Sequence, residues 1–253
     1  MTSSSTTDAD EIERFNQLAA TWWDTSGPMW PLHLLNQFRV QLILAVLTDQ
    51  RQIDPGKEHP LTGFTALDIG CGGGILSEAL AKLGANVTGV DMAEKNVAIA
   101  RHHATQNKLD IRYLCQEVSG LDEQFDLVFN MEVVEHVSDL ETFLNACCER
   151  VQPGGMMFLS TINRTWKSYL FAILGAEYVL NLLPKGTHQW SKFVSPQKVE
   201  ALFQQHSLDT IWQTGVSLNP FKKRYSPTQS MAVNYMLAAR KGGTKHHGST
   251  TGI

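Results

Sequence analysis

The sequence has little of what marks a secreted, membrane-spanning or nucleic-acid-binding protein. Its 4 cysteines show no C-x-x-C spacing, so neither a disulfide framework nor a cysteine-rich metal site is expected. It has no uncharged apolar run of about 18 residues, the length that a spanning helix requires. Long basic runs are also missing and the net charge is −4, which argues against nucleic acid as a partner.

The two ends of the chain are expected to be disordered. Residues 1–10 are rich in Ser and Thr and contain no Lys or Arg, which argues against a signal peptide or a mitochondrial presequence. Residues 241–253 are rich in Gly, Thr and His. The part between them, 11–240, is long enough to bury one sizeable core, since 43% of the chain is hydrophobic. We therefore expect one domain in a reducing, cytoplasmic compartment.

Strand-like and helix-like segments alternate from residue 65 onward. Five apolar segments are expected to be strands, and they end at Ile69, Val90, Cys115, Asn130 and Ser160. Two later segments, 210–216 and 232–239, bring the expected number of strands to seven. This alternation predicts a doubly wound, mostly parallel α/β sheet. Helices within 11–50 are expected before the sheet, and a helical insertion over about 165–192 is expected after the fifth strand.

The turn after the first strand is the most informative segment of the chain. It runs from Asp68 to Gly74 with the sequence DIGCGGG, and its glycines let a ligand approach the backbone closely. A dinucleotide fingerprint that starts at Gly70 would need glycine at position 75, where the chain has Ile75. The Asp68 carboxylate would also repel a pyrophosphate. A cationic ligand fits better, and S-adenosylmethionine carries an ammonium and a sulfonium group, so we expect Asp68, Gly70 and Gly72 to bind it.

A second acid, Asp91, ends the second strand 21 residues after Gly70. A carboxylate at this position can accept hydrogen bonds from both hydroxyls of an adenosine ribose. The alternative is that Asp91 caps the helix expected to start near Ala93. The glycine turn and the two acids at this spacing favour the ribose role.

Ordered motifs over about residues 65 to 160 resemble the class I S-adenosylmethionine-dependent methyltransferases, which have a Rossmann-like fold. These motifs are Asp68–Gly74, the strand end at Asp91, Asn130–Val137 and Pro153-Gly154-Gly155. A narrower resemblance, from about Ile12 to Ala239, is to the O-methyltransferase family of ubiquinone biosynthesis. It is carried by Trp22-Trp23-Asp24, Pro31-Leu32-His33, Thr161-Ile162-Asn163-Arg164, Gly175-Ala176-Glu177-Tyr178, Pro184-Lys185-Gly186-Thr187-His188 and Val233-Asn234-Tyr235-Met236-Leu237. At Gln189-Trp190 the chain departs from the family pattern, which touches no assigned role.

The resemblance implies methylation of a ring hydroxyl of 2-polyprenyl-6-hydroxyphenol and of 3-demethylubiquinol. Two other functions remain open from the sequence. One is a methyltransferase of the same fold that acts on another phenolic small molecule. The other is a non-catalytic, membrane-associated subunit that binds the cofactor within a complex of ubiquinone-biosynthesis proteins.

Two further residues receive cofactor roles from the resemblance. Arg39 lies in an otherwise apolar helix, where a solvated arginine is the simpler interpretation. The family places an arginine here against the cofactor, and its guanidinium can pair with the methionine carboxylate. Met131, at the end of the fourth strand, is either an ordinary core residue or packs against the adenine, as the family implies.

The residues after the fourth strand raise the question of a metal. Glu132, Glu135 and His136 stand at i, i+3 and i+4, on one face if the segment is helical. Two carboxylates and an imidazole can hold a divalent cation, and the resemblance implies Mg²⁺ here. Alternatively, the trio orients substrate or cofactor without metal, as in many metal-free methyltransferases. The base that takes the phenol proton is left unassigned between His136 and His188.

The segment Trp166–Trp190 is apolar and aromatic, with Lys167, Lys185 and Lys192 in or beside it. It is too short to span a bilayer but can lie in the interface, attracted by anionic lipid. A helical cap over the substrate pocket is the alternative, and both can hold. We therefore expect peripheral association with the inner membrane of a bacterium, where a polyprenylated substrate resides.

Overall fold

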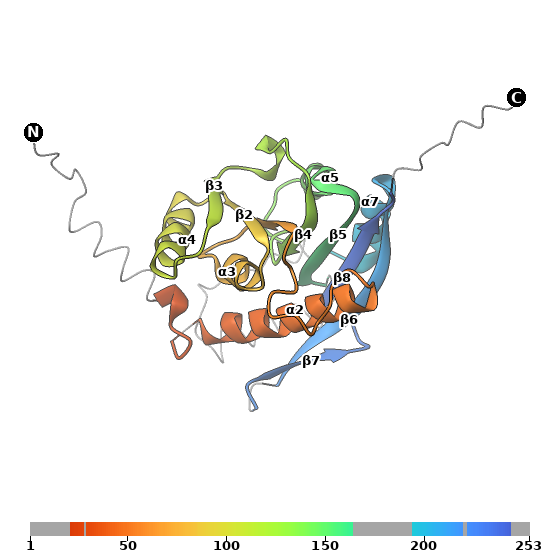
Figure 1. Ribbon diagram of the computed structural model, residues 1–253. Helices are drawn as coiled ribbons and strands as arrows, with labels where there is room; N and C mark the ends of the chain where they lie inside the picture. Colours follow the sequence, from red (N-terminus) through yellow and green to blue (C-terminus); the bar gives the residue numbers. More distant parts are fainter. Residues whose placement is uncertain (1–20, 28, 164–193, 220–221, 244–253) are drawn as a thin grey trace, which may run out of the picture.

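The computed structural model describes residues 21–27, 29–163, 194–219 and 222–243 (Figure 1). Most of the first expected helix and the whole 165–192 insertion lie outside these residues. Eight strands form one sheet in the order β3-β2-β1-β4-β5-β8-β6-β7. Their bounds are β1 Thr65–Ile69, β2 Asn86–Asp91, β3 Ile111–Cys115, β4 Phe125–Met131, β5 Val151–Ile162, β6 Leu208–Asn219, β7 Arg224–Thr228 and β8 Asn234–Lys241.

The first five strands are parallel, as expected, and the last three add antiparallel pairs. From β1 the chain moves outward to β2 and β3 and then crosses back to β4 on the other side of β1. This reversal makes β1 and β4 the topological switch point, where ligands bind in open α/β sheets. The carboxyl ends of β1, β2, β4 and β5 therefore meet at one edge of the sheet.

The expectation of seven strands was wrong, because the sheet has an eighth strand, β7. β7 has the sequence RYSPT, without the apolar alternation by which a strand is recognised. It contains Pro227, which cannot donate to a ladder and is tolerated because β7 lies at the sheet edge and pairs with β6 alone.

Two other boundaries also differ from expectation. β5 begins at Val151, before the Pro153-Gly154-Gly155 turn, and its register against β4 shifts between Phe125 and Leu127. Gly154 takes a left-handed φ of 82° there. At the other end of the chain, Lys241 is the last residue of β8 and not part of a disordered tail: its Nζ donates to the carbonyls of Cys148 at 2.9 Å and Val151 at 2.8 Å.

The helices are α2 Trp30–Asp49, α3 Ile75–Lys82, α4 Glu94–Gln106, α5 Leu140–Glu149 and α7 Pro196–Gln205, with a 3₁₀ turn at Val118–Gly120. Two of them, α5 and α7, start after a residue whose side chain caps the first turn. Asp139 caps α5 by accepting hydrogen bonds from the backbone N–H groups of Glu141 and Thr142, and Ser195 caps α7 before a proline. Gly74, at a left-handed φ of 88°, turns the chain directly from the glycine loop into α3.

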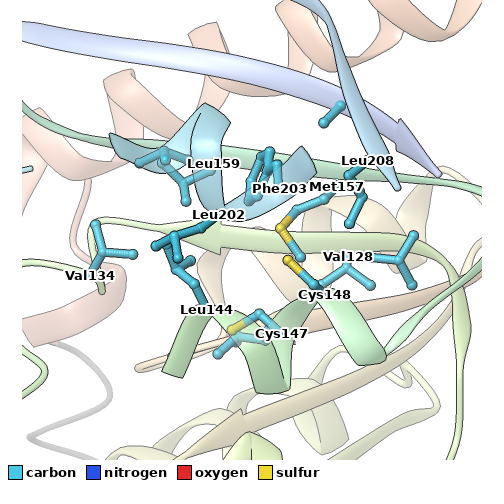
Figure 2. Close-up of a cluster of buried hydrophobic side chains, with 14 of the residues drawn as sticks. Val128, Val134, Leu144, Cys147, Cys148, Met157, Leu159, Leu202, Phe203 and Leu208 are labelled. Carbon is cyan, nitrogen blue, oxygen red and sulfur yellow. The ribbon is translucent and has the colours of Figure 1, made fainter. Parts of the chain in front are cut away.

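The central strands β1, β2, β4, β5 and β8 are buried on both faces, and alternate residues enter different cores. Phe129 and Phe158 stack at 5.3 Å on the face covered by α2 and α3. Met157 and Leu159 point to the other face, where they meet side chains of α5 and α7 (Figure 2). Among the described residues, no helix combines the length and apolar character needed to cross a bilayer.

Candidate active site at the switch point

The glycine loop after β1 is held tightly at the switch point. Gly70, Gly72 and Gly74 have left-handed φ angles of 70°, 53° and 88°. The Gly70 N–H donates to the carbonyl of Val90 at 2.8 Å, which fastens the loop to β2. A Cβ built on Gly70 would lie 2.4 Å from Cγ2 of Val133, so the position cannot hold a side chain without displacing the chain after β4.

Asp68 is buried beneath this loop, on the face of the sheet that α3 covers. Its Oδ2 accepts a hydrogen bond of 2.6 Å from the Ser77 hydroxyl. Burial raises the pKa of Asp68 to about 6, and the hydrogen bond from Ser77 opposes that shift. A nearby cation would favour the ionised carboxylate, as expected for the binding of a positively charged ligand.

Asp91 is bound on both carboxylate oxygens. Oδ2 accepts from the Gly72 N–H at 2.9 Å, and Oδ1 accepts from the Ala93 N–H at 2.8 Å. The N-cap residue of α4 is Ala93 and not Asp91, so the contact with the Ala93 N–H lies before the first turn of the helix. Asp91 therefore joins the ends of β1 and β2, and helix capping does not account for its position.

Arg39 reaches the end of β4 from α2. It is only 4% exposed, so the solvated interpretation of this residue was wrong. Its guanidinium pairs with the carboxylate of Glu132, which also accepts from the Ser160 hydroxyl at 2.9 Å. Glu132 has a left-handed φ of 59°, a conformation uncommon outside glycine, and its N–H donates to the Ser160 carbonyl at 2.9 Å.

The segment after β4 is a turn and not the helix on which the shared face of the trio depended. Glu135 is buried and accepts a 2.7 Å hydrogen bond from Thr161. Burial raises the pKa of Glu135 to about 8, with a further contribution from the charge of Glu132. His136 is exposed.

This arrangement does not fit a bound metal ion. Glu132 is already paired with Arg39, burial disfavours the charged form of Glu135 and raises its pKa to about 8, and His136 lies on the surface. Over the residues that the structure describes, no group of three or more His, Cys, Asp or Glu side chains is placed to hold a cation. The structure therefore brings Glu132 and Glu135 together but does not build the expected Mg²⁺ site.

Met131 ends β4 beside these carboxylates and is half-buried. It packs at the margin of the core between the sheet and α2–α3. It lies at the expected edge of the sheet, and its contact with an adenine stays a prediction.

Sequence reasoning missed Ser160 and Thr161, whose hydroxyls bind the two glutamates. Their signal lies in strand pairing, because Ser160 is the direct partner of Met131 across β4 and β5. A site residue on β4 therefore has a neighbour on β5 that no local motif marks.

Known proteins resemble the whole chain. Over 243 residues it is 46% identical to the ubiquinone biosynthesis O-methyltransferase of Brucella ovis, covering 95% of this chain and 98% of that protein. The enzyme of the same name from Methylobacterium sp. is 46% identical over 237 residues, and the match covers 92% of this chain and 95% of that protein. The chain belongs to the ubiquinone biosynthesis O-methyltransferase family. A methyltransferase-domain family model matches residues 67–159, which include the glycine loop and β4.

Solved structures show the same fold as this member of the ubiquinone biosynthesis O-methyltransferase family. Magnesium protoporphyrin IX methyltransferase from Synechocystis PCC 6803 with bound SAH has a TM-score of 0.63 at 18% identity, covering 92% of this chain and 95% of that one. The structure of the same enzyme with bound SAM has a TM-score of 0.59 at 17% identity, and the match covers 94% of this chain and 100% of that one. The expected Rossmann-like, class I methyltransferase fold is confirmed, and the protein is a methyltransferase that uses S-adenosylmethionine.

The raised pKa of Glu135 predicts a dependence of stability on pH. The native state holds this proton more tightly than the unfolded chain does. The stabilisation is therefore complete below the ordinary pKa of 4.5 and is lost as the pH rises through about 8. Glu135→Gln imitates the protonated acid, so at pH 8 its free energy of unfolding should exceed that of the wild type by on the order of 3 kcal/mol.

Urea denaturation between pH 5 and pH 8 measures this difference. The exposed Glu58→Gln is the control and should follow the wild type at every pH. A constant gap between Glu135→Gln and the wild type across this range would show that Glu135 does not hold a proton in the native state.

Proposed function

We propose that the protein transfers the methyl group of S-adenosylmethionine to a ring hydroxyl of 2-polyprenyl-6-hydroxyphenol and of 3-demethylubiquinol. The observation that carries this proposal is the 46% identity to ubiquinone biosynthesis O-methyltransferases over 95% of the chain. The site at the switch point supports it, because acids and a glycine loop stand where a cationic nucleoside cofactor would bind.

The described residues account for each part of the cofactor. Asp91 would accept hydrogen bonds from the ribose hydroxyls. The Gly72 N–H engages Oδ2 alone, and the long 3.4 Å contact from Asn96 shares Oδ1 with the Ala93 N–H, so the cofactor would meet the remaining lone pairs and could displace Asn96. Gly70 and Gly72 would let the backbone approach, with Asp68 supplying negative charge beneath them. Met131 would pack against the adenine.

The Arg39 guanidinium has five N–H donors. Among the described residues, a donor on its Nη2 binds the Glu132 carboxylate. The remaining donors would hold the methionine carboxylate of the cofactor. The same arginine would then fix the cofactor and the carboxylate at the end of β4 in one arrangement.

The chemistry is an in-line displacement. The phenol oxygen attacks the methyl carbon, the carbon–sulfur bond breaks, S-adenosylhomocysteine leaves, and the phenol proton passes to a base. The protein chiefly aligns the two reactants and keeps water out. Of the two candidate bases, His136 is exposed and His188 lies outside the described residues.

Two alternatives are less well supported. A related methyltransferase that acts on another phenol would have the same cofactor site, and product analysis separates it from the proposal. A non-catalytic subunit among other ubiquinone-biosynthesis proteins would need the glycine loop to bind the cofactor. It would not also need the hydrogen-bonded glutamates and hydroxyls at the ends of β4 and β5. Assembly with such proteins is compatible with catalysis.

Methyl transfer from radiolabelled cofactor to a short-chain demethylated quinol tests the function directly. Label should appear on a ring oxygen, and turnover should persist after exhaustive chelation, because Arg39 already neutralises Glu132. Loss of turnover in chelator that Mg²⁺ restores would instead show that Glu132, Glu135 and His136 rearrange around a cation. Absence of transfer to any quinol, with the cofactor bound, would refute the substrate.

Asp91→Ala should weaken cofactor binding by about 1.5–3 kcal/mol, the typical worth of hydrogen bonds to a charged group. Titration calorimetry with S-adenosylhomocysteine measures the change. The matched control is Asp110→Ala, an exposed aspartate that precedes β3 at the opposite edge of the sheet. Equal affinity in wild type and Asp91→Ala would remove Asp91 as the ribose ligand.

We further propose peripheral docking on the cytoplasmic membrane of a bacterium through Trp166–Trp190. These residues lie outside the described part of the chain, so the proposal depends on their apolar and aromatic sequence and on Lys167, Lys185 and Lys192. The segment follows β5, whose carboxyl end lies at the edge of the sheet that carries the site. A polyprenylated substrate would then enter from the bilayer.

Co-sedimentation with vesicles tests this docking. Binding should be stronger to vesicles with anionic lipid than to neutral ones, and replacing Leu170 and Phe171 with Ser should reduce it. The same substitutions should slow turnover of a long-tailed substrate more than that of a short-tailed one. Equal slowing of both would make the segment a pocket cap, and unchanged vesicle binding would exclude the docking.

A further inference from the structure

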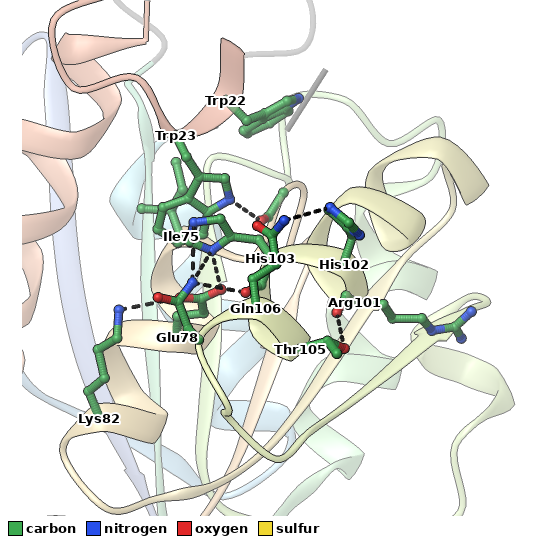
Figure 3. Close-up of polar contacts among 12 residues, drawn as sticks. Trp22, Trp23, Ile75, Glu78, Lys82, Arg101, His102, His103, Thr105 and Gln106 are labelled. Carbon is green, nitrogen blue, oxygen red and sulfur yellow. Dashed lines mark hydrogen bonds and ion pairs between the residues drawn. The ribbon is translucent and has the colours of Figure 1, made fainter. Parts of the chain in front are cut away.

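Two adjacent tryptophans, Trp22 and Trp23 (labelled in Figure 3), contact the glycine loop. A Cβ built on Gly73 would lie 2.8 Å from Cδ2 of Trp22, and a Cβ built on Gly72 would lie 3.1 Å from Cη2 of the same tryptophan. The Trp23 indole N–H donates to the carbonyl of Gly73 at 3.2 Å. The loop is therefore covered by one indole and hydrogen-bonded by the next.

Contacts with two helices hold these tryptophans in place. The carbonyl oxygen of Trp22 lies 2.8 Å from Nε2 of His33 on α2. The ring of Trp23 stacks on His103 of α4, with centroids 3.7 Å apart and planes 7° from parallel. Such stacking adds to the free energy of burial and restricts the ring to one orientation.

His103 in turn is tied to the helix that follows the loop. Its Nδ1 lies 2.5 Å from Oε1 of Glu78, whose other oxygen pairs with Lys82 at 3.3 Å. Glu78 is fully buried in the first turn of α3, and its N–H donates to the carbonyl of Gly74. A chain of contacts thus runs from Trp23 through His103 to Glu78 at the end of the loop.

We propose that Trp22 and Trp23 are positioning residues for S-adenosylmethionine, acting through the glycine loop. This inference rests on the proposed cofactor site. A loop with four glycines in five residues has unusual backbone freedom, and a ligand that orders it binds more weakly for that reason. The two indoles restrict the loop before the cofactor arrives, so their removal weakens cofactor binding without changing the methyl-transfer step.

Gly73 gives this inference a separate test. Its φ is not left-handed, unlike those of Gly70, Gly72 and Gly74, so its backbone conformation does not demand glycine. The closest obstacle to a Cβ there is the Trp22 ring. Alanine at this position should therefore act by displacing Trp22.

Steady-state kinetics and calorimetry with S-adenosylhomocysteine test the proposal. Trp22→Ala should raise the cofactor Kd and KM about five- to tenfold, the scale of one lost aromatic contact or hydrogen bond. At saturating cofactor its kcat, and its KM for the quinol, should stay within about twofold of the wild type. Trp23→Phe, which keeps the stacking and loses the hydrogen bond, should have a smaller effect on Kd than Trp23→Ala.

The control is Trp212→Ala, a half-buried tryptophan on β6, four places from β1 along the sheet. It should lower the Tm and leave the cofactor Kd unchanged. Gly73→Ala should weaken binding in the wild type and have little further effect in Trp22→Ala, because the obstacle is gone. Additive losses would overturn the inference, as would an unchanged Kd in a folded Trp22→Ala protein. If the wild type itself bound no S-adenosylhomocysteine, the proposed function would fail instead.

Discussion

The parallel pairing of β1 with β2 on one side and β4 on the other is the constraint on which the site depends. It brings together three strand ends that are far apart in the sequence: the glycine loop, Asp91 and the Met131–Glu132 corner. The register also aligns these strand ends along the strand direction, because Ile69 lies opposite both Val90 and Asn130. A slip of one residue would send Asp68 to the opposite face, away from Ser77.

The carboxylates at this edge are each bound by a neighbour from another element. Asp68 is bound by α3, Glu132 by α2 and β5, and Glu135 by β5. Buried carboxylates without such partners would cost several kcal/mol each. The two neighbouring acids also differ in their surroundings: Glu132 pairs with Arg39, whereas burial raises the pKa of Glu135 to about 8. Charge at the end of β4 is therefore set before any ligand binds.

The sequence predicted the parts of the fold that local pattern controls. β3 has the expected bounds and β1 the expected end, because apolar residues between turns identify buried strands. β7 was missed because its residues neither alternate nor form an apolar run, and it exists only through pairing with β6. The site followed the same division. Asp68 and Gly70 belong to one local motif, Asp91 ends the next parallel strand, and the three are gathered as expected. The shared helical face expected for Glu132, Glu135 and His136 does not form, because the chain turns there.

Contacts that cross the sequence were not predictable from local pattern. Arg39 and Glu132 are 93 positions apart in the sequence, and Thr161 on β5 meets Glu135 in the turn after β4. Trp22 and Trp23 were recognised only as part of a family resemblance, and their place on the glycine loop depends on how α2, α3 and α4 converge.

The position of β8 has a consequence for how the molecule is made. β1 to β5 occupy one continuous stretch, residues 65–162, and can pair in the order in which they leave the ribosome. β8 is the last of the described strands in sequence order, yet it lies between β5 and β6 with Tyr235 to Ala239 fully buried. Until residue 241 emerges, the nascent protein presents an open β5 edge and an unattached β6–β7 hairpin, both prone to wrong pairing. The strands that carry the proposed cofactor site, β1 to β5, are thus complete early, but the sheet joins into one only when β8 pairs with both β5 and β6.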